Sequence, residues 1–309
     1  MAAKRRGSTK RSDIYATITD QVITQLEAGV APWHQPWANG LGMPRSMSTG
    51  KLYRGGNVML LAISARVNDY TSPWWGTYRQ IAERGGQVRG GEKSTLITFW
   101  RTDVETDERT GQERRRVILR TSRVFNAEQA DGLALPEPPM PRDNERIAAC
   151  DEAVAGYLAR GPRLRIGGDR AYYNSVRDEL ALPPRSAFDT SEHYYGALFH
   201  ELTHSTGHAS RLAREGITEG HHFGDPDYSR EELIAEMGAA MLAGITGVAA
   251  VTLPESAAYL QSWINVLRGD TRLVMKAAAA AQKAADLILD AAAVVAEPDS
   301  DVEHARSAA

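Results

Sequence analysis

Apolar residues recur at helical spacing near the start of the chain. Residues 13–28 have one apolar stripe, which predicts a helix that stops at Gly29. The in-phase side chains are Ile14, Ile18, Val22 and Leu26. Further elements predicted in this half are a helix at about 56–67, a short helix after Trp75 and up to Gly85, and paired strands at 94–101 and 115–125 around the charged turn ETDERTGQE.

The second half of the chain has a different order of elements. A helix at about 144–160 is followed by three short strands, near 163–166, 171–174 and 178–182, which we expect to form one small sheet packed against the next helix. That helix has Thr190 or Ser191 as its cap, and Gly207 is expected to adopt a left-handed conformation just past its end. The fold class is therefore predicted to be α+β.

A third helix in this half is predicted to begin at Ser229 and to run into residues 237–254, which carry no charge. The Gly and Ala content of that stretch and Pro254 favour a buried helix and a turn over a membrane span. One cysteine, Cys150, excludes an internal disulfide, and no signal peptide is apparent. We therefore expect a cytoplasmic protein with no membrane partner.

Charge divides the chain into two parts. Residues 1–126 have 20 Lys and Arg against 11 Asp and Glu, whereas residues 127–309 have 16 against 28. A proline-rich stretch, DGLALPEPPMPRDN, lies near the change and predicts a linker. The predicted organisation is a basic tail (1–11), a first domain (12–132), the linker (133–144), a second domain (145–296) and a disordered tail (297–309).

The most specific chemical signal is His200-Glu201-Leu202-Thr203-His204. On a helix, His200 and His204 share one face and can bind a single ion, while Glu201 beside them can act as general base towards a bound water. Six of the eight histidines lie between residues 193 and 222, which strengthens the metal interpretation. The expected metal is Zn²⁺, with another divalent ion open.

A hydrolytic zinc site needs a third protein ligand, and the segment SREELIAEMGAAML offers one. Glu232 and Glu236 are four residues apart and share a helix face. We expect Glu232 to be the third ligand and Glu236 to orient a ligating histidine. Glu231 and Glu236 are the rival ligands, and all three glutamates could instead merely complement the helix N-terminus.

Cations and aromatic residues alternate in the basic half, which is typical of single-stranded nucleic-acid binding, where cations contact phosphates and rings stack on bases. The alternative is that the tryptophans belong to a domain core. The candidate contacts lie in predicted loops and helix starts: Arg45, Lys51, Tyr53, Arg54, Trp74, Trp75, Arg79 and Lys93.

The segments ITDQVITQLEAGVAPWHQPW, TGKLYRGGNVMLL and RVFNAEQADGL resemble the N-terminal domain of ArdC-type antirestriction proteins, which some plasmid primases share. The segments YYNSVRDELALP and FHELTHSTGH, with the SREELIAEMGAAML segment, resemble the zincin-like metallopeptidase domain that follows it. The resemblance implies a single-stranded-DNA-binding domain joined to a metallopeptidase-like domain, encoded on mobile elements such as conjugative plasmids and protecting incoming DNA from host restriction.

Two functions of different class follow from these signals. In one, the chain coats DNA and the metal only holds the second domain together; in the other, it is a DNA-tethered metallopeptidase that cleaves a host or regulatory protein. For cleavage, an extended peptide would pair with an edge strand near Arg177-Asp178-Glu179-Leu180. The candidates for stabilising the oxyanion are Tyr194, Tyr195, His208 and Tyr228.

Overall fold

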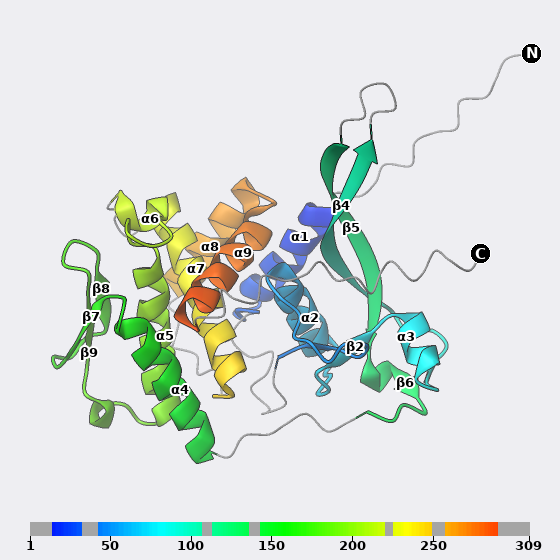
Figure 1. Cartoon of the computed structure of the whole chain (residues 1–309), viewed down its shortest axis with the longest axis horizontal. Coiled ribbons are helices and arrows are strands. Elements are labelled where there is room, and N and C mark those ends of the chain that lie inside the picture. Colours follow the sequence, from blue (N-terminus) through cyan, green and yellow to red (C-terminus); the bar gives the residue numbers. More distant parts are fainter. Residues whose placement is uncertain are drawn as a thin grey trace, which may run out of the picture.

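The computed structural model describes residues 14–32, 43–106, 113–135, 143–219, 225–248 and 257–289. Two groups of elements lie on either side of a central set of helices, α1, α8 and α9 (Figure 1). The predicted basic tail, the acidic tail, most of the linker, and His221 with His222 lie outside the described residues.

The N-terminal elements combine short helices with two small sheets. They are α1 (Ile14–Glu27), β1 (Arg45–Ser46), α2 (Gly56–Val67), β2 (Trp74–Gly76), α3 (Tyr78–Glu83), β3 (Gln87–Val88), β4 (Thr95–Thr106), β5 (Glu113–Asn126), the 3₁₀ turn Ala127–Gln129 and β6 (Ala130–Asp131). One sheet has the order β1-β2-β5-β4, and the other pairs β3 with β6. The predicted helices and the predicted strand pair are confirmed, and the antiparallel β4–β5 ribbon projects away from the body (Figure 1).

The C-terminal elements are mainly helical. They are α4 (Asp143–Leu158), β7 (Arg163–Ile166), β8 (Tyr172–Asn174), β9 (Glu179–Leu182), the 3₁₀ turn Arg185–Ala187, α5 (Ser191–Thr206), α6 (Glu215–Thr218), α7 (Pro226–Thr246), α8 (Ala257–Gly269) and α9 (Leu273–Ile288). The three predicted strands form one sheet, as expected, with the order β7-β9-β8. Both the mixed α+β class and the small sheet beside α5 are thus confirmed.

Three predicted local details are wrong. Gly207 follows α5 with a φ of −76°, which is a right-handed and not a left-handed conformation. A glycine fits here for a different reason: a Cβ at this position would lie 2.6 Å from the Ile217 side chain. Ser229 does not cap α7, because that helix already begins at Pro226. The segment near Arg177 to Leu180 is not an edge strand, because β9 pairs with β7 on one side and with β8 on the other.

One hydrophobic core crosses the boundary between the two halves of the sequence. Ile18, Val22 and Leu26 of the predicted apolar stripe of α1 are buried in the same cluster as residues of α2, α5, α7 and α9. Helix α9 packs against α4, α5 and α7 on one side and against α1 and α2 on the other. Two polar contacts reinforce this junction: the Thr19 hydroxyl donates to the Thr271 carbonyl at 2.7 Å, and the Gly55 amide donates to Gln282 Oε1 at 3.0 Å. The Ala-rich C-terminal segment therefore joins the two parts.

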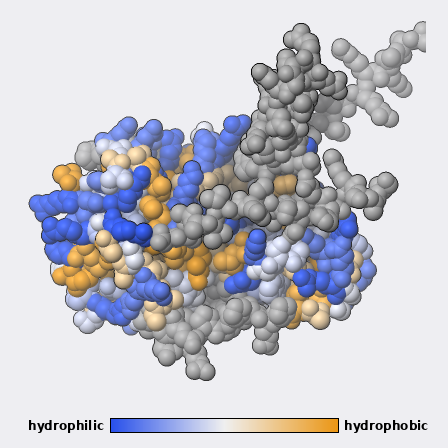
Figure 2. All heavy atoms as spheres, viewed as in Figure 1, coloured by the Kyte–Doolittle hydropathy of each residue, from blue (hydrophilic) through white to orange (hydrophobic). Residues whose placement is uncertain are grey.

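The surface agrees with this arrangement. Figure 2 shows hydrophilic residues over the side of the small sheet and over the region of α3, with apolar residues between them. The uncharged stretch of α7 is buried, as predicted, with Met237, Met241 and Leu242 inaccessible to solvent. Among the described residues, every helix is too short or too polar to cross a bilayer.

Candidate metal centre

The site is built where α5 crosses α7. Helix α5 begins after Thr190, whose hydroxyl accepts a hydrogen bond from the His193 amide, so one of the two predicted caps is the one used. At the crossing, a Cβ on Gly238 would lie 2.5 Å from Thr203 Cγ2, so glycine lets the two helices approach closely. This close approach brings the histidines of α5 next to the glutamates of α7.

Three side chains converge on one point. The Nε2 atoms of His200 and His204 are 3.0 Å apart, and the two oxygens of Glu232 lie 3.4 Å from the first and 3.5 Å from the second. Ligands about 2.1 Å from a tetrahedral ion are roughly 3.4 Å apart, so these distances fit a bound divalent metal. Among the described residues, this trio is the group whose donor atoms can share one ion. His200, His204 and Glu232 form a divalent-metal site.

Each histidine has a second carboxylate at its other ring nitrogen. Glu236 Oε1 lies 2.9 Å from His200 Nδ1, and Glu231 Oε1 lies 3.2 Å from His204 Nδ1. Carboxylates in these positions fix the ring orientation and leave both Nε2 atoms directed at the metal position. This geometry supports the role expected for Glu236, and it places Glu231 in an equivalent role that the sequence reasoning did not assign.

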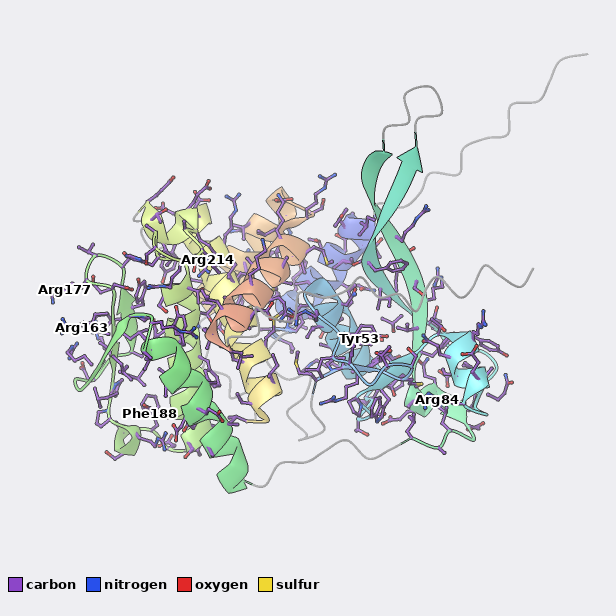
Figure 3. All side chains as sticks on the ribbon, viewed as in Figure 1. Tyr53, Arg84, Arg163, Arg177, Phe188 and Arg214 are labelled. Atoms are coloured by element: carbon purple, nitrogen blue, oxygen red, sulfur yellow. The ribbon has the colours of Figure 1, made fainter. Side chains whose placement is uncertain are left out.

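Arg214 holds Glu231 in place. Its Nε and Nη2 atoms donate to the two carboxylate oxygens at 2.9 and 2.6 Å, and Nη2 also donates to the Thr203 carbonyl at 2.8 Å. Figure 3 shows Arg214 beside α5, near α6. The sequence offered no signal for this arginine, because its turn lies outside the helical motifs. Through these hydrogen bonds, Arg214 links the end of α5 to the start of α7.

The electrostatics of the cluster favour a cation. Burial lowers the pKa of His200, but Glu236 and Glu232 outweigh burial and the pKa lies well above its usual value. Burial raises the pKa of Glu232, but His204 and His200 reverse the effect and the pKa is lowered. Burial likewise raises the pKa of Glu231, and Arg214 and His204 bring it below the usual range. The carboxylates are therefore ionised, and the site attracts positive charge.

A pocket of about 410 Å³ opens onto the metal position. Its lining includes Glu201, the predicted general base, together with Tyr228 from α7 and Tyr172 from the edge strand β8. Tyr228 hydrogen-bonds to Glu232. Of the four residues proposed for the oxyanion, Tyr228 is the one that lines this pocket.

The other three oxyanion candidates lie elsewhere. The Tyr195 hydroxyl donates to Asp151, and its ring packs edge to face against Tyr194. His208 accepts a hydrogen bond from the Ser210 amide beyond the end of α5. These contacts give all three residues structural roles away from the pocket.

The sheet beside the pocket is anchored by a partly buried ion pair. Arg211 donates to both oxygens of Asp178 and, through Nε, to the Ser205 carbonyl, while the Tyr173 hydroxyl donates to Asp178 at 2.8 Å. Asp178 thus ties β8 and β9 to the end of α5. The expected peptide-binding strand is corrected accordingly: β8 borders the pocket and, within the described part of the chain, pairs on one side only.

The candidate nucleic-acid residues are not gathered on one surface. Trp75 is 1% exposed and packs with Leu61, Ile97 and Val124, and Trp74 is also buried. Neither ring can stack on a base in this conformation. The alternative that the tryptophans belong to the core therefore holds for these two residues. Trp74 and Trp75 of β2 pack into two different hydrophobic clusters.

The remaining candidates have varied surroundings. Arg54 forms an ion pair with Asp286 of α9, and Arg79 pairs with Glu83 at 2.7 Å. Lys51 and Lys93 are exposed. Arg45 donates to the Gly50 carbonyl, and Tyr53 is half-buried between the two groups of elements (Figure 3).

Comparison with known proteins agrees with this architecture. Residues 12–125 match the N-terminal domain of the anti-restriction factor ArdC, and residues 152–280 match a zincin-like metallopeptidase. The crystal structure of the antirestriction ArdC protein from plasmid R388, in its metal-free form, superposes with a TM-score of 0.75 at 41% sequence identity, covering 91% of this chain and 98% of that one. The chain belongs to the ArdC family. The Mn(II)-bound structure of the R388 protein superposes with a TM-score of 0.72 at 38% identity, so this ArdC relative takes a divalent metal.

Two curated relatives show how the ArdC architecture is used elsewhere. The uncharacterized protein y4eC of Sinorhizobium fredii is 34% identical over 89% of this chain and 91% of its own length. A DNA primase TraC of Escherichia coli is 37% identical over 90% of this chain, which spans only 27% of the primase. The same arrangement therefore occurs both by itself and within a larger DNA-processing protein.

Proposed function

We propose that this protein binds single-stranded DNA and protects incoming DNA from host restriction. The observation that carries the proposal is the 41% identity, over nearly the whole chain, to a protein described as antirestriction. The basic first half of the sequence and the likeness to part of a DNA primase support a nucleic-acid partner. DNA of a mobile element that enters as a single strand is the corresponding substrate.

The metal centre supports a second activity, hydrolysis of a peptide bond. Two imidazoles, one carboxylate and an adjacent glutamate are the set used by zinc peptidases, and we propose zinc as the resident ion. A bound divalent ion would supply Lewis-acid activation of water and of the scissile carbonyl. Glu201 accepts the proton of the attacking water and passes it to the leaving amine.

Other residues of the pocket would position the substrate. An extended peptide pairs with the free edge of β8, which holds it against the pocket wall. Tyr228, which lines the pocket, would donate its hydroxyl proton to a developing oxyanion. The proposed substrate is a host or regulatory protein.

Glu201→Gln separates the two activities, because it removes the general base and leaves all three metal ligands intact. We expect metal content and DNA binding to persist while peptidase activity falls by about 10²–10⁴-fold. The decisive measurement is the efficiency with which unmodified plasmid DNA is transferred into a restricting host. Protection that survives Glu201→Gln supports DNA coating, whereas its loss with intact DNA binding supports proteolysis. A protein that binds no single-stranded DNA at low salt contradicts the first proposal.

A further inference from the structure

A second pocket, of about 500 Å³, lies between the two groups of elements. Its walls come from the start of α1, the start of α2, the β4–β5 ribbon and α9, and Figure 1 shows these four elements meeting beside the centre of the molecule. We call it the basic pocket. Its size suits a small organic ligand or one unit of a polymer.

Three cations line the basic pocket, and no Asp or Glu occurs among the described residues that line it. Arg54 comes from the turn before α2, Arg272 is the N-cap of α9, and Lys276 lies in the first turn of α9. The side chain of Lys276 pairs with Asp270 at 2.8 Å, and Arg54 pairs with Asp286. Exposed ion pairs of this kind contribute little and can be exchanged for contacts with an anionic ligand. The pocket therefore favours an anion.

The pocket also has an aromatic and apolar part. The Arg272 guanidinium lies 5.4 Å from the centre of the Tyr15 ring, a cation–π arrangement. Met275 covers Gly56 so closely that a Cβ there would lie 2.3 Å from its sulfur, and Leu119 of β5 completes the apolar lining. Hence the same pocket offers a ring and apolar side chains next to positive charge.

We propose that the basic pocket holds one nucleotide of single-stranded DNA, with the base against Tyr15 and Met275 and the flanking phosphates at Arg54, Arg272 and Lys276. This inference rests on the proposed DNA-binding function and gives it a location. Stacking on a ring beside phosphate-binding cations is how single strands are bound without regard to sequence. A paired base cannot enter, because it must leave its stack to reach a pocket of this kind.

Residues from both halves of the chain line the basic pocket. Arg272 caps α9 and Lys276 lies in its first turn, and α9, the last helix among the described residues, packs against α5 and α7 of the metal centre. The second half of the chain would thus complete the DNA site. It follows that DNA binding must be measured on the full chain.

The first test uses a fluorescent oligothymidylate and the anisotropy of its complex with the full-length protein. Arg272→Ala combined with Lys276→Ala is expected to lower affinity by tenfold or more, and to reduce the slope of log affinity against log salt by about 1.4, which is about 0.7 for each lost phosphate contact. Lys283→Ala is the matched control, because Lys283 is an exposed lysine of the same helix that does not line the pocket. It should change neither quantity beyond a small nonspecific effect.

The second test concerns the ring. Tyr15→Phe keeps the ring and should bind as the wild type does, whereas Tyr15→Leu should lose roughly tenfold in affinity. Thermal melting of each variant, and Lys276→Gln as a milder substitution, keep the result interpretable if a variant is less stable. The single-stranded probe should be displaced by unlabelled single strands and not by the matching duplex.

Failure of this inference differs from failure of the proposed function. A wild-type protein that binds no single-stranded DNA overturns both. A wild type that binds, with the Arg272 and Lys276 variant indistinguishable from Lys283→Ala, places the DNA elsewhere and overturns the basic pocket alone. Equal displacement by duplex and single strand also contradicts it, since a duplex offers no free base.

Discussion

The metal pocket and the basic pocket are of similar size and opposite charge. The first is lined by Glu201, Glu231 and Glu232, and its only nitrogen ligands are imidazoles that can bind a metal. The second is lined by three cations without a carboxylate among its described residues. Because a phosphate is repelled by the first and a metal ion by the second, a single chain can bind both ligands without competition.

The two pockets also differ in how they are supported. Each metal ligand sits on one of two helices in close contact, and each histidine has a further carboxylate within 3.2 Å of its other ring nitrogen. The cations of the basic pocket are on exposed side chains, and two of them, Arg54 and Lys276, pair with half-buried aspartates. A rigid site suits an ion with fixed geometry, whereas mobile cations suit a flexible strand.

The largest expected effect is on metal content. Replacing both His200 and His204 by alanine removes two of the three ligands, so binding should fall by orders of magnitude, from about one ion per chain to almost none. Elemental analysis after gel filtration measures this. Affinity for single-stranded DNA should stay unchanged, because neither histidine lines the basic pocket.

This double substitution tests both the metal site and the independence of the two pockets. If metal is retained at the wild-type level, the ion lies elsewhere and the pocket is not a metal site. If DNA affinity falls together with metal content while the protein stays folded, the two pockets are coupled and their separation is wrong.

The next effect is on stability. Trp75→Ala removes a fully buried indole from β2 of the four-stranded sheet and should lower the free energy of unfolding by about 3–5 kcal/mol, measured with urea. Trp75→Phe should cost less, because part of the ring volume remains. This variant tests whether an aromatic residue of the basic half supports the fold or contacts DNA: below the unfolding transition, the remaining folded protein should bind DNA normally.

The metal site was predictable because its residues are close in sequence. A helix puts residues four apart on one face, so the motif around Glu201 and the pair Glu232 and Glu236 already contained the geometry. Glu231 was less accessible to such reasoning: its role depends on Arg214, which reaches it from a turn with no periodic pattern. Helix phase alone could not distinguish a ligand from its neighbour.

The basic pocket could not be predicted in the same way. Its residues come from positions as far apart as Tyr15 and Gln282, and they meet only because α9 packs between the two halves. Composition located the charge in the first half, whereas two of the three cations are in the acidic half. The interpretation of Trp74 and Trp75 as DNA contacts was wrong for a related reason. Tryptophans are abundant in this basic region because its small core needs large side chains.

An intermediate effect is expected from the carboxylates behind the histidines. Glu236→Gln and Glu231→Gln should each weaken metal binding about 10–100-fold, because the neutral amide no longer stabilises the orientation and basicity of His200 or His204. A competition titration with a chelating dye measures the affinity. Glu231→Gln should also reduce stability, since Arg214 is left buried without its ionic partner.

Glu192→Gln is a suitable control for this pair. It removes one carboxylate in the first turn of α5, the helix that carries both histidines, away from the pocket at the metal site, and should leave the titration unchanged. Should all three variants weaken binding equally, the loss reflects net charge, and the positioning role assigned to Glu231 and Glu236 is wrong.

The smallest expected effect would be a gain in DNA affinity. Asp286 competes with phosphate for Arg54, and it also accepts a hydrogen bond from Gln282 at 3.0 Å. Asp286→Asn keeps the size and the hydrogen bond and removes the charge, so affinity for the oligothymidylate should rise by roughly two- to fivefold, the equivalent of about 0.5–1 kcal/mol for an exposed pair. Asp227→Asn is the matched control, since it opens the exposed Arg230–Asp227 pair on α7, away from the basic pocket. An equal gain in both variants would mean that DNA responds only to the overall charge of the protein. A gain confined to Asp286→Asn, and lost again when Arg54 is also replaced by alanine, assigns the phosphate contact to Arg54 itself.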